Sequence, residues 1–186
     1  MGLEIAESCQ LRLLVEDDAD ELHALIEADR ERLARWLRWA ETQTHSDTLE
    51  FIRKSEAQAA GNDGFQAAIE VEGRIAGVIG FTGVDWENRS TGLGYWLAAE
   101  YEGRGLMTAA VEALGEHALE VWELNRVEIR AAAENRRSRA IPERLGFRQD
   151  GVLRDAERIG GRYLDVVVYS MVTGDRGGAQ NTGDSV

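Results

Sequence analysis

The segment Leu93–Leu114, LGYWLAAEYEGRGLMTAAVEAL, constrains what this chain can fold into more than any other stretch. Aromatic and aliphatic residues alternate over Leu93–Ala98, which predicts a buried strand. A polar turn follows, with glycines at positions 103 and 105. After the turn, apolar residues recur at spacings of three and four, which predicts an amphipathic helix that contains Met107, Val111, Leu114, Ala118 and Val121.

A strand, a glycine turn and a helix start in this order favour an anion site. Gly103 and Gly105 let the main chain approach a phosphate closely, and the first N–H groups of a helix have no partner within it. Arg104 adds a positive charge. We interpret the turn as the pyrophosphate cradle of a nucleotide-containing cofactor; a purely structural turn is the alternative that these residues alone leave open.

Two other phosphate motifs do not fit the turn. A Walker A loop requires Gly-Lys followed by Ser or Thr, and the only lysine of the chain is Lys54. The dinucleotide fingerprint requires a third glycine, and position 108 is Thr.

The composition sets limits on function. The 186 residues carry 34 acids and 21 bases, for a net charge of −13. Nucleic-acid binding is not expected, because phosphate neutralisation requires a basic surface. The charge would steer cationic substrates or merely aid solubility. No apolar run approaches the roughly 20 residues that span a bilayer, and Cys9 is the only cysteine. We expect a cytoplasmic protein without membrane contact.

The order of elements is α+β. We expect a strand over Gln10–Val15 and two helical segments that break near Asp29. A further helix begins at Ser46 or Asp47 and ends at Gly61. The remaining expected strands are Phe65–Val71, Arg74–Thr82, Val127–Ala131, Phe147–Leu153 and Tyr163–Val172, with a hairpin turn at Glu72-Gly73, a short helix over Ser138–Leu145 and a disordered tail over residues 174–186.

A second segment points to a family. Asn135-Arg-Arg-Ser138 is followed by Leu145-Gly-Phe147, and both lie downstream of Glu102-Gly-Arg-Gly105-Leu-Met107. Together these motifs closely resemble the GNAT superfamily of acyl-CoA-dependent N-acyltransferases, and the resemblance extends to its RimJ/RimL branch. Two residues depart from the pattern: Glu102 stands where Gln or Arg is usual, and Met107 where Gly or Ala is usual. Glu102 would have to point away from the phosphates.

The resemblance implies the GNAT fold, a central mixed, mostly antiparallel sheet flanked by helices, in one N-acetyltransferase domain over residues 1–173. It also implies acetyl-CoA as cosubstrate, with the pantetheine arm between strands that splay apart near Leu97 and Ala132. A main-chain N–H near Leu97 would stabilise the oxyanion. The residues implied in cofactor binding are Trp96, Leu97, Ala98, Gly103, Arg104, Gly105, Leu106, Met107, Thr108 and Asn135.

The family transfers the acetyl group directly to an amine, so Cys9 need not be a nucleophile. Glu157 matches the glutamate of the RimL-like pattern and is the candidate base, and Ser138 matches the serine that assists the departing thiolate. The alternatives are that Ser138 only caps its helix and that Glu157 is one more solvated carboxylate.

The resemblance makes the amino group of a protein N-terminus, from a ribosomal protein, the first choice of acceptor. A small cationic amine (polyamine, amino acid or aminoglycoside) is the second choice, and a non-catalytic acyl-CoA sensor is the third. Trp39, Trp86 and Tyr95 are candidates to line the acceptor groove, although core packing is the stronger expectation for Tyr95. The three histidines lack metal-ligand spacing, so we expect no metal. A homodimer is an analogy with relatives.

Overall fold

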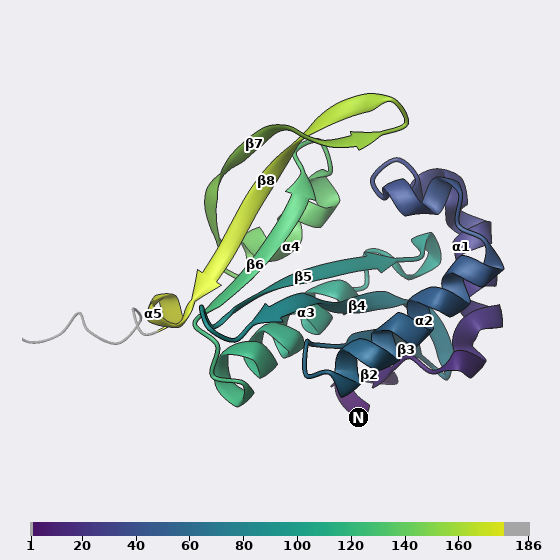
Figure 1. The fold of residues 1–186 in the computed structure, drawn as a ribbon, viewed down its shortest axis with the longest axis horizontal. Coiled ribbons are helices and arrows are strands. Elements are labelled where there is room, and N and C mark those ends of the chain that lie inside the picture. The colour runs from purple at the N-terminus through teal and green to yellow at the C-terminus, as the bar shows by residue number, and fades with distance from the viewer. Residues whose placement is uncertain (1, 177–186) are drawn as a thin grey trace, which may run out of the picture.

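A single mixed sheet organises the residues that the computed structural model describes, 2–176 (Figure 1). The strand order is β1-β2-β3-β4-β5-β6-β8-β7. Neighbouring strands are antiparallel except β5 and β6, which run parallel. The predicted mixed, mostly antiparallel sheet is confirmed. The strands are Gly2–Ala6 (β1), Cys9–Leu13 (β2), Gln66–Val71 (β3), Arg74–Asp85 (β4), Ser90–Leu97 (β5), Arg126–Ala132 (β6), Arg148–Ile159 (β7) and Arg162–Val172 (β8).

Strands β3, β4 and β5 form an antiparallel meander. Glu72 and Gly73 join β3 to β4 with φ angles of 51° and 76°, the left-handed conformations of a tight hairpin turn. Between β4 and β5, Gly80 lies opposite Gly94. A Cβ atom on Gly80 would approach the main-chain carbonyl oxygen of Phe65 to 2.6 Å, and main chain cannot move aside as a side chain can, so glycine is required there. The two glycines leave a shallow strip on this face of the sheet.

Helices cover both faces of the sheet. The helices α1 (Ala19–Leu33) and α2 (His45–Ala60) pack on one face, against residues that include Ile75 and Val78. On the other face α3 (Leu106–Glu116) packs in the largest core cluster, which the partly buried side chains of α4 (Arg136–Arg144) border (Figure 1). A π-helical turn, η4 (His117–Val121), continues α3. Alternating β4 side chains enter the two clusters, as expected for a strand buried on both faces.

Two helix starts and one helix break differ from the prediction. Helix α1 runs through Asp29 without a break, because that side chain pairs with Arg32 three residues on. Helix α2 is capped by Thr44, whose hydroxyl accepts the N–H of Asp47, so Asp47 is the third helical residue and not the cap. Helix α4 begins before Ser138, because Asn135 provides its cap.

The two ends of the chain also differ. Strand β1 was not predicted, since its residues are largely exposed and lack a clear apolar pattern. Residues 173–176 form a short helix, α5 (Thr173–Arg176), where the prediction placed the start of a disordered tail. The remainder of that predicted tail, 177–186, lies outside the described residues.

Candidate active site

The parallel strands β5 and β6 separate halfway along their length. They are paired from Ser90 and Arg126 as far as Leu93 and Ile129, after which β6 continues beside β8 alone. This is the splay that the sequence resemblance predicts. Beyond the last pair, one edge of β5 has no strand beside it.

The main-chain groups of β5 alternate between β4 and this open edge. The N–H of Ala98 donates to the carbonyl of Ala76 at 2.8 Å, so residue 98 faces β4. By the alternation, Tyr95 and Leu97 direct their N–H and carbonyl groups into the cleft. By the same alternation the main-chain N–H groups of Trp96 and Ala98 face β4, so of the predicted contacts 96–98 only Leu97 directs its N–H into the cleft; the carbonyl of Ala98 also accepts the N–H of Tyr101.

The glycine turn forms an open cradle at the start of α3. Gly103 and Gly105 have φ angles of 76° and 79°, and Gly105 caps the helix. The first helical hydrogen bond runs from Ala109 to Gly105, so the N–H groups just before it have no helical acceptor. Leu106 and Met107 are buried, so they present main chain rather than side chains. An anion would meet a ring of N–H groups.

A cavity of about 700 Å³ adjoins the cradle. The cradle forms one wall, and side chains of α4 form the other. Thr108 accepts a hydrogen bond from Arg144 of α4 at 2.8 Å, and the Arg104 guanidinium lies 5.7 Å from the centre of the Tyr101 ring. Arginine side chains of α4, Arg137 and Arg144, line this cavity, whereas Arg104, predicted to contact the cofactor, is not among the residues that line it.

Asn135 and Ser138 lie at the start of α4, directly after β6. The side-chain oxygen of Asn135 accepts the N–H of Ser138 at 3.2 Å, so Asn135 and not Ser138 caps the helix. The amide nitrogen of Asn135 and the hydroxyl of Ser138 make no hydrogen bond with other described residues, and both remain available to a ligand. The carbonyl of Ser138 accepts a hydrogen bond from the hydroxyl of Tyr95.

Glu157 lies on the long β7–β8 hairpin, directly opposite Leu164. Residues opposite each other in an antiparallel pair share a face. Leu164 is buried with Ala132 at the end of β6, and Trp36 packs against them. The carboxylate of Glu157 therefore projects from the hairpin face that turns toward the end of β6. It is exposed and has no hydrogen-bond or ion-pair partner among the described residues.

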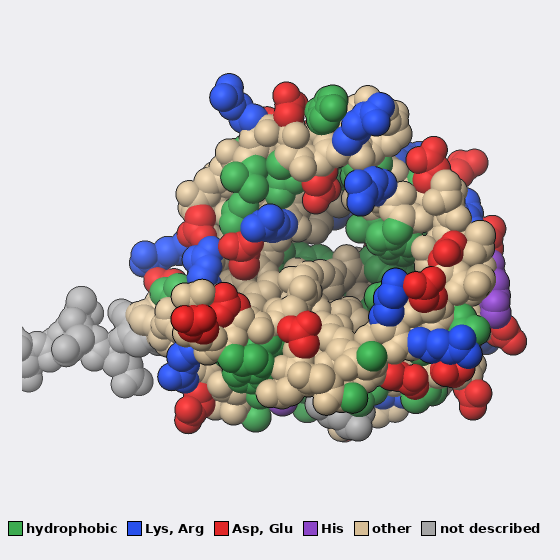
Figure 2. All heavy atoms as spheres, viewed as in Figure 1, with side chains coloured by type: hydrophobic (Ala, Val, Ile, Leu, Met, Phe, Trp, Pro, Cys, Tyr) green, Lys and Arg blue, Asp and Glu red, His purple; other side chains and the backbone are tan. Residues whose placement is uncertain are grey.

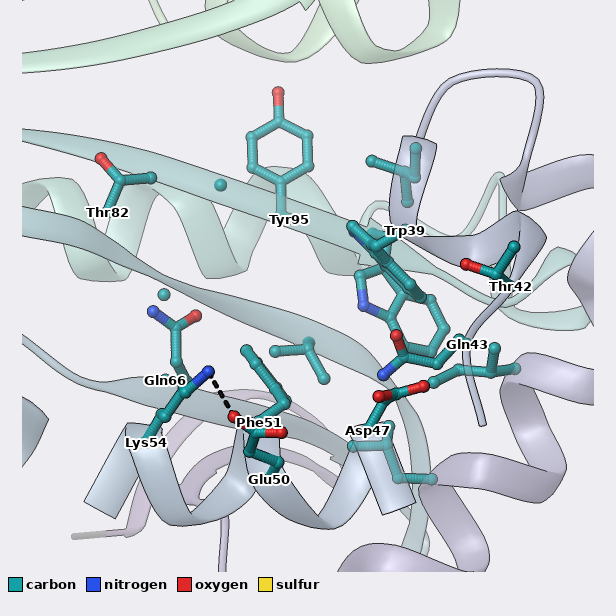
Figure 3. A pocket seen from close by; sticks show the side chains of 17 residues that line it. Trp39, Thr42, Gln43, Asp47, Glu50, Phe51, Lys54, Gln66, Thr82 and Tyr95 are labelled. Atoms are coloured by element: carbon teal, nitrogen blue, oxygen red, sulfur yellow. Dashed lines mark ion pairs between the residues drawn. The ribbon is translucent and has the colours of Figure 1, made fainter. Parts of the chain in front are cut away.

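A second cavity, of about 610 Å³, opens on the sheet face that carries α1 and α2. Gly80 and Gly94 form part of its floor, and Trp39 packs against Trp96 with ring centres 6.1 Å apart. Figure 3 shows Asp47 and Gln43 near Trp39 and the Lys54–Glu50 ion pair farther along α2. Tyr95 also borders this cavity. Figure 2 shows the molecule hollowed between the β7–β8 side and the α1 side.

Comparisons with known proteins agree with this geometry. Residues 9–148 match the family model described as an acetyltransferase (GNAT) domain. The chain belongs to the GNAT acetyltransferase family. Its sequence is 39% identical over 171 residues to that of YdaF of Bacillus subtilis strain 168, which is named as a candidate ribosomal N-acetyltransferase. The alignment covers 91% of this chain and 93% of YdaF.

Two further relatives extend the comparison. The ribosomal-protein-serine acetyltransferase of Escherichia coli K12 is 28% identical, with 91% of this chain and 96% of the relative covered. The microcin C7 self-immunity acetyltransferase MccE, solved in complex with acetyl-CoA and AMP, superimposes with a TM-score of 0.87 at 28% identity, covering 92% of this chain and 96% of MccE. The GNAT fold and an N-acetyltransferase activity follow from these matches.

Trp86 does not lie with the other predicted acceptor residues. It is in the β4–β5 turn, where its indole N–H donates to the carbonyl of Asn62 at 2.8 Å and its ring lies 5.8 Å from that of Trp122. The cavity that contains Trp39 and Tyr95 does not include it. The polar residues around Trp86 suggested a functional loop, whereas the ring in fact covers the edge of an aromatic cluster.

Two residues at the cleft were missed from the sequence. Arg32 of α1 donates to the carbonyl of Leu97 at 2.6 Å, and Asp29 accepts both from Arg32 and from the main-chain N–H of Ala99. The hydrogen bond from Arg32 holds the pKa of Asp29 below its usual range. These contacts fix the end of β5 beside the cleft. The only sequence signal for these two residues was their spacing, an acid and a base three positions apart in α1.

No group of three or more His, Cys, Asp or Glu side chains in residues 2–176 is arranged to hold a metal ion. No helix in the same range is long and apolar enough to cross a membrane.

Proposed function

We propose that this protein uses acetyl-CoA to acetylate a primary amine by direct transfer, and that the amine is the N-terminal amino group of a protein. The observation that carries the proposal is the splay of β5 and β6 after Leu93 and Ile129, which opens a slot from the glycine cradle to the end of β5. The cradle supplies N–H groups for a diphosphate. MccE, a relative with the same fold, was solved with acetyl-CoA, which supports this choice of cosubstrate.

Acetyl-CoA fits the groups that the chain presents. The open edge of β5 offers the N–H and carbonyl groups of Tyr95 and the N–H of Leu97 to the amides of the pantetheine arm, and the free amide nitrogen of Asn135 is a further donor. Acetyl-CoA supplies an activated acyl thioester. The N–H of Leu97 points into the cleft and would stabilise the oxyanion that forms when the amine attacks.

Two side chains would carry out the proton transfers, one from the attacking amine and one to the departing thiolate. An α-amino group with a pKa of about 7.7–8.0 is already partly neutral at pH 7, so an exposed carboxylate such as Glu157 suffices as base, whereas a lysine near 10.4 would need more help. The hydroxyl of Ser138 would donate to the departing thiolate. Glu157 lies on β7 and Ser138 on α4, so the two would act on the amine and on the thiolate from opposite sides.

The acceptor would enter through the cavity beside Trp39. Its aromatic wall and glycine floor suit a flexible peptide end rather than a bulky folded surface. The names of the relatives from B. subtilis and E. coli make a ribosomal protein the first acceptor to test. Such a reaction belongs in the cytoplasm.

One observation favours a small cationic amine as a second candidate. Asp47 and Glu50 lie on the α2 wall of the acceptor cavity, and Lys54 is the one basic residue among the described residues that line it. With a net charge of −13, the protein would attract a polycation. A non-catalytic acyl-CoA sensor would keep the cradle and dispense with Glu157.

Thiol release from acetyl-CoA tests these possibilities. The acceptors would be peptides that begin with Ser or Ala, the same peptides with blocked N-termini, and spermidine. Glu157→Gln would be compared with Glu87→Gln, a matched loss of an exposed glutamate in the β4–β5 turn. We expect turnover of the free peptides only, a large loss of kcat in Glu157→Gln, and wild-type turnover in Glu87→Gln.

The other results are equally informative. Turnover of spermidine alone would overturn the peptide acceptor and keep the acetyltransferase activity. Calorimetric binding of acetyl-CoA without turnover of any amine would favour the sensor. If Glu157→Gln retains full activity over the pH range, the base assignment is wrong.

A further inference from the structure

Glu102 forms a bridge between two helices at the mouth of the cofactor cavity. One carboxylate oxygen accepts from Arg32 of α1 at 2.6 Å, and the other pairs with Arg137 of α4. The residue follows η3 (Ala99–Tyr101), directly before the glycine turn. Glu102 therefore points away from the N–H ring, as the sequence required of an acid at this position.

The two ion pairs differ in their surroundings. The side chain of Arg32 is 28% exposed and is also held by Asp29 and by the carbonyl of Leu97, whereas that of Arg137 is 82% exposed and has no other partner among the described residues. An ion pair that involves a guanidinium mostly in water contributes little. The link from Glu102 to Arg32 is thus the more firmly held, and the link to Arg137 is the one that a ligand can exchange.

The exchangeable link crosses the cofactor cavity. Glu102 belongs to the cradle wall and Arg137 to the α4 wall, and both line the same space of about 700 Å³. Arginine binds phosphate with two parallel, charge-assisted hydrogen bonds, which are stronger than an exposed ion pair. A ligand phosphate in the cradle would therefore compete with Glu102 for Arg137.

Glu102 can release Arg137 without becoming an unpaired anion. Arg32 remains on its other oxygen, so the charge that would face the phosphates stays compensated. The exchange leaves one guanidinium on the carboxylate and brings another to the phosphate.

We propose that Arg137 is a phosphate-binding residue for the acyl-CoA, and that Glu102 holds it across the groove as a latch until the cofactor phosphates take it over. The inference rests on the proposed use of acetyl-CoA. In this proposal Glu102, the unusual acid of the glycine motif, holds Arg137 near the phosphate site before the cosubstrate binds. The competition with Glu102 lowers the affinity for the acyl-CoA somewhat.

Equilibrium binding tests the latch without any turnover. Isothermal calorimetry would measure CoA, 3′-dephospho-CoA and pantetheine, which carries no phosphate, on Arg137→Gln, Arg137→Lys and Glu102→Gln. Arg136→Gln is the matched control, because Arg136 is exposed on the same helical turn and its side chain makes no hydrogen bond or ion pair with other described residues. Thermal melts without ligand confirm that each variant is folded.

We expect Arg137→Gln to weaken CoA binding about tenfold, as for the loss of a charge-assisted phosphate contact, and to leave pantetheine unchanged. Arg137→Lys should recover part of the loss. Glu102→Gln keeps an acceptor for Arg32 but frees Arg137, so it should tighten CoA binding roughly threefold. That gain should vanish in the Glu102→Gln/Arg137→Gln double variant. Comparison of CoA with 3′-dephospho-CoA identifies which phosphate Arg137 reaches.

Three results would overturn the latch: CoA binding unchanged in Arg137→Gln, an equal loss for CoA and pantetheine, or weaker CoA binding in a folded Glu102→Gln. Failure of the wild-type protein to bind CoA would instead overturn the proposed function, so the two ideas fail separately.

Discussion

The hydroxyl of Tyr95 donates to the main-chain carbonyl of Ser138 at 3.1 Å. This bond ties β5, whose edge faces the cleft, to the first turn of α4, which carries the candidate thiolate donor. Burial raises the pKa of Tyr95 to about 12, so the hydroxyl keeps its proton throughout the physiological range. Tyr95 is thus a positioning residue between the two walls of the cleft.

Tyr95→Phe should therefore lower activity by displacing Ser138. The variant keeps the ring and loses one hydrogen bond, so we expect a free-energy cost of about 1 kcal/mol and a fall in kcat of up to about fivefold. Steady-state kinetics would show the loss in kcat, with the KM for acetyl-CoA nearly unchanged.

Tyr163→Phe is the control for that prediction. Tyr163 is exposed on β8, and its hydroxyl has no partner among the described residues. It should retain wild-type kinetics. Equal effects in the two variants would show that the Tyr95 hydroxyl has no special role.

Two glycines of one helix should respond to alanine in opposite ways. Gly105 caps α3 with a φ of 79°, a conformation that costs an L-residue about 1–2 kcal/mol. Gly115 lies inside α3, and a Cβ there would meet nothing within 4 Å. Gly105→Ala should lower the free energy of unfolding and weaken CoA binding, while Gly115→Ala should raise stability by about 0.5–1 kcal/mol. Urea unfolding and calorimetry measure both. If Gly105→Ala is as stable as Gly115→Ala, the turn is not constrained.

Local patterns predicted most of the fold and the cradle. The alternation of β5, the glycines before α3 and the turn at Glu72-Gly73 are each encoded within a few neighbouring residues, and the structure places them as expected. Boundaries were less certain where a side chain caps a helix: Thr44 and Asn135 each lie one residue before the helix that they begin.

Contacts between distant residues were beyond local reasoning. Arg32 reaches Leu97 and Glu102 across more than 60 positions of sequence, and only the packing of α1 on the sheet brings them together. The misplacement of Trp86 has the same origin, because its partner Trp122 is on the segment after α3. The roles of Glu157 and Ser138 stay predictions.

The network at the end of β5 should weaken in acid. The bond from Arg32 lowers the pKa of Asp29 in the folded state, so this contribution to stability is complete above the unfolded value of about 3.9 and is lost as the pH falls through the lower folded value. Urea unfolding should show Asp29→Asn less stable than wild type by a constant amount from pH 7 to 5, and the difference should shrink below about pH 4.

Asp17→Asn controls for the loss of one acidic charge. Asp17 is exposed in the 3₁₀ turn η1 (Glu16–Asp18), and its side chain makes no hydrogen bond or ion pair with other described residues. Its difference from wild type should be small at pH 7. A stability gap for Asp29→Asn that persists unchanged to pH 3 would show that geometry, and not charge, matters at Asp29.

Trp39 and Trp86 offer a matched test of where the acceptor binds. Both are similarly exposed, at 37% and 42%, but only Trp39 lines the cavity with Tyr95. Trp39→Ala removes an aromatic wall, so the KM for the acceptor should rise about tenfold while the Kd for CoA is unchanged. Trp86→Ala removes the hydrogen bond to Asn62 and the ring contact with Trp122. It should lower the free energy of unfolding by about 1–2 kcal/mol, less than the loss of a buried tryptophan, because the Trp86 side chain is half exposed. Its acceptor kinetics should be normal. The reverse pattern would place the acceptor at the β4–β5 turn.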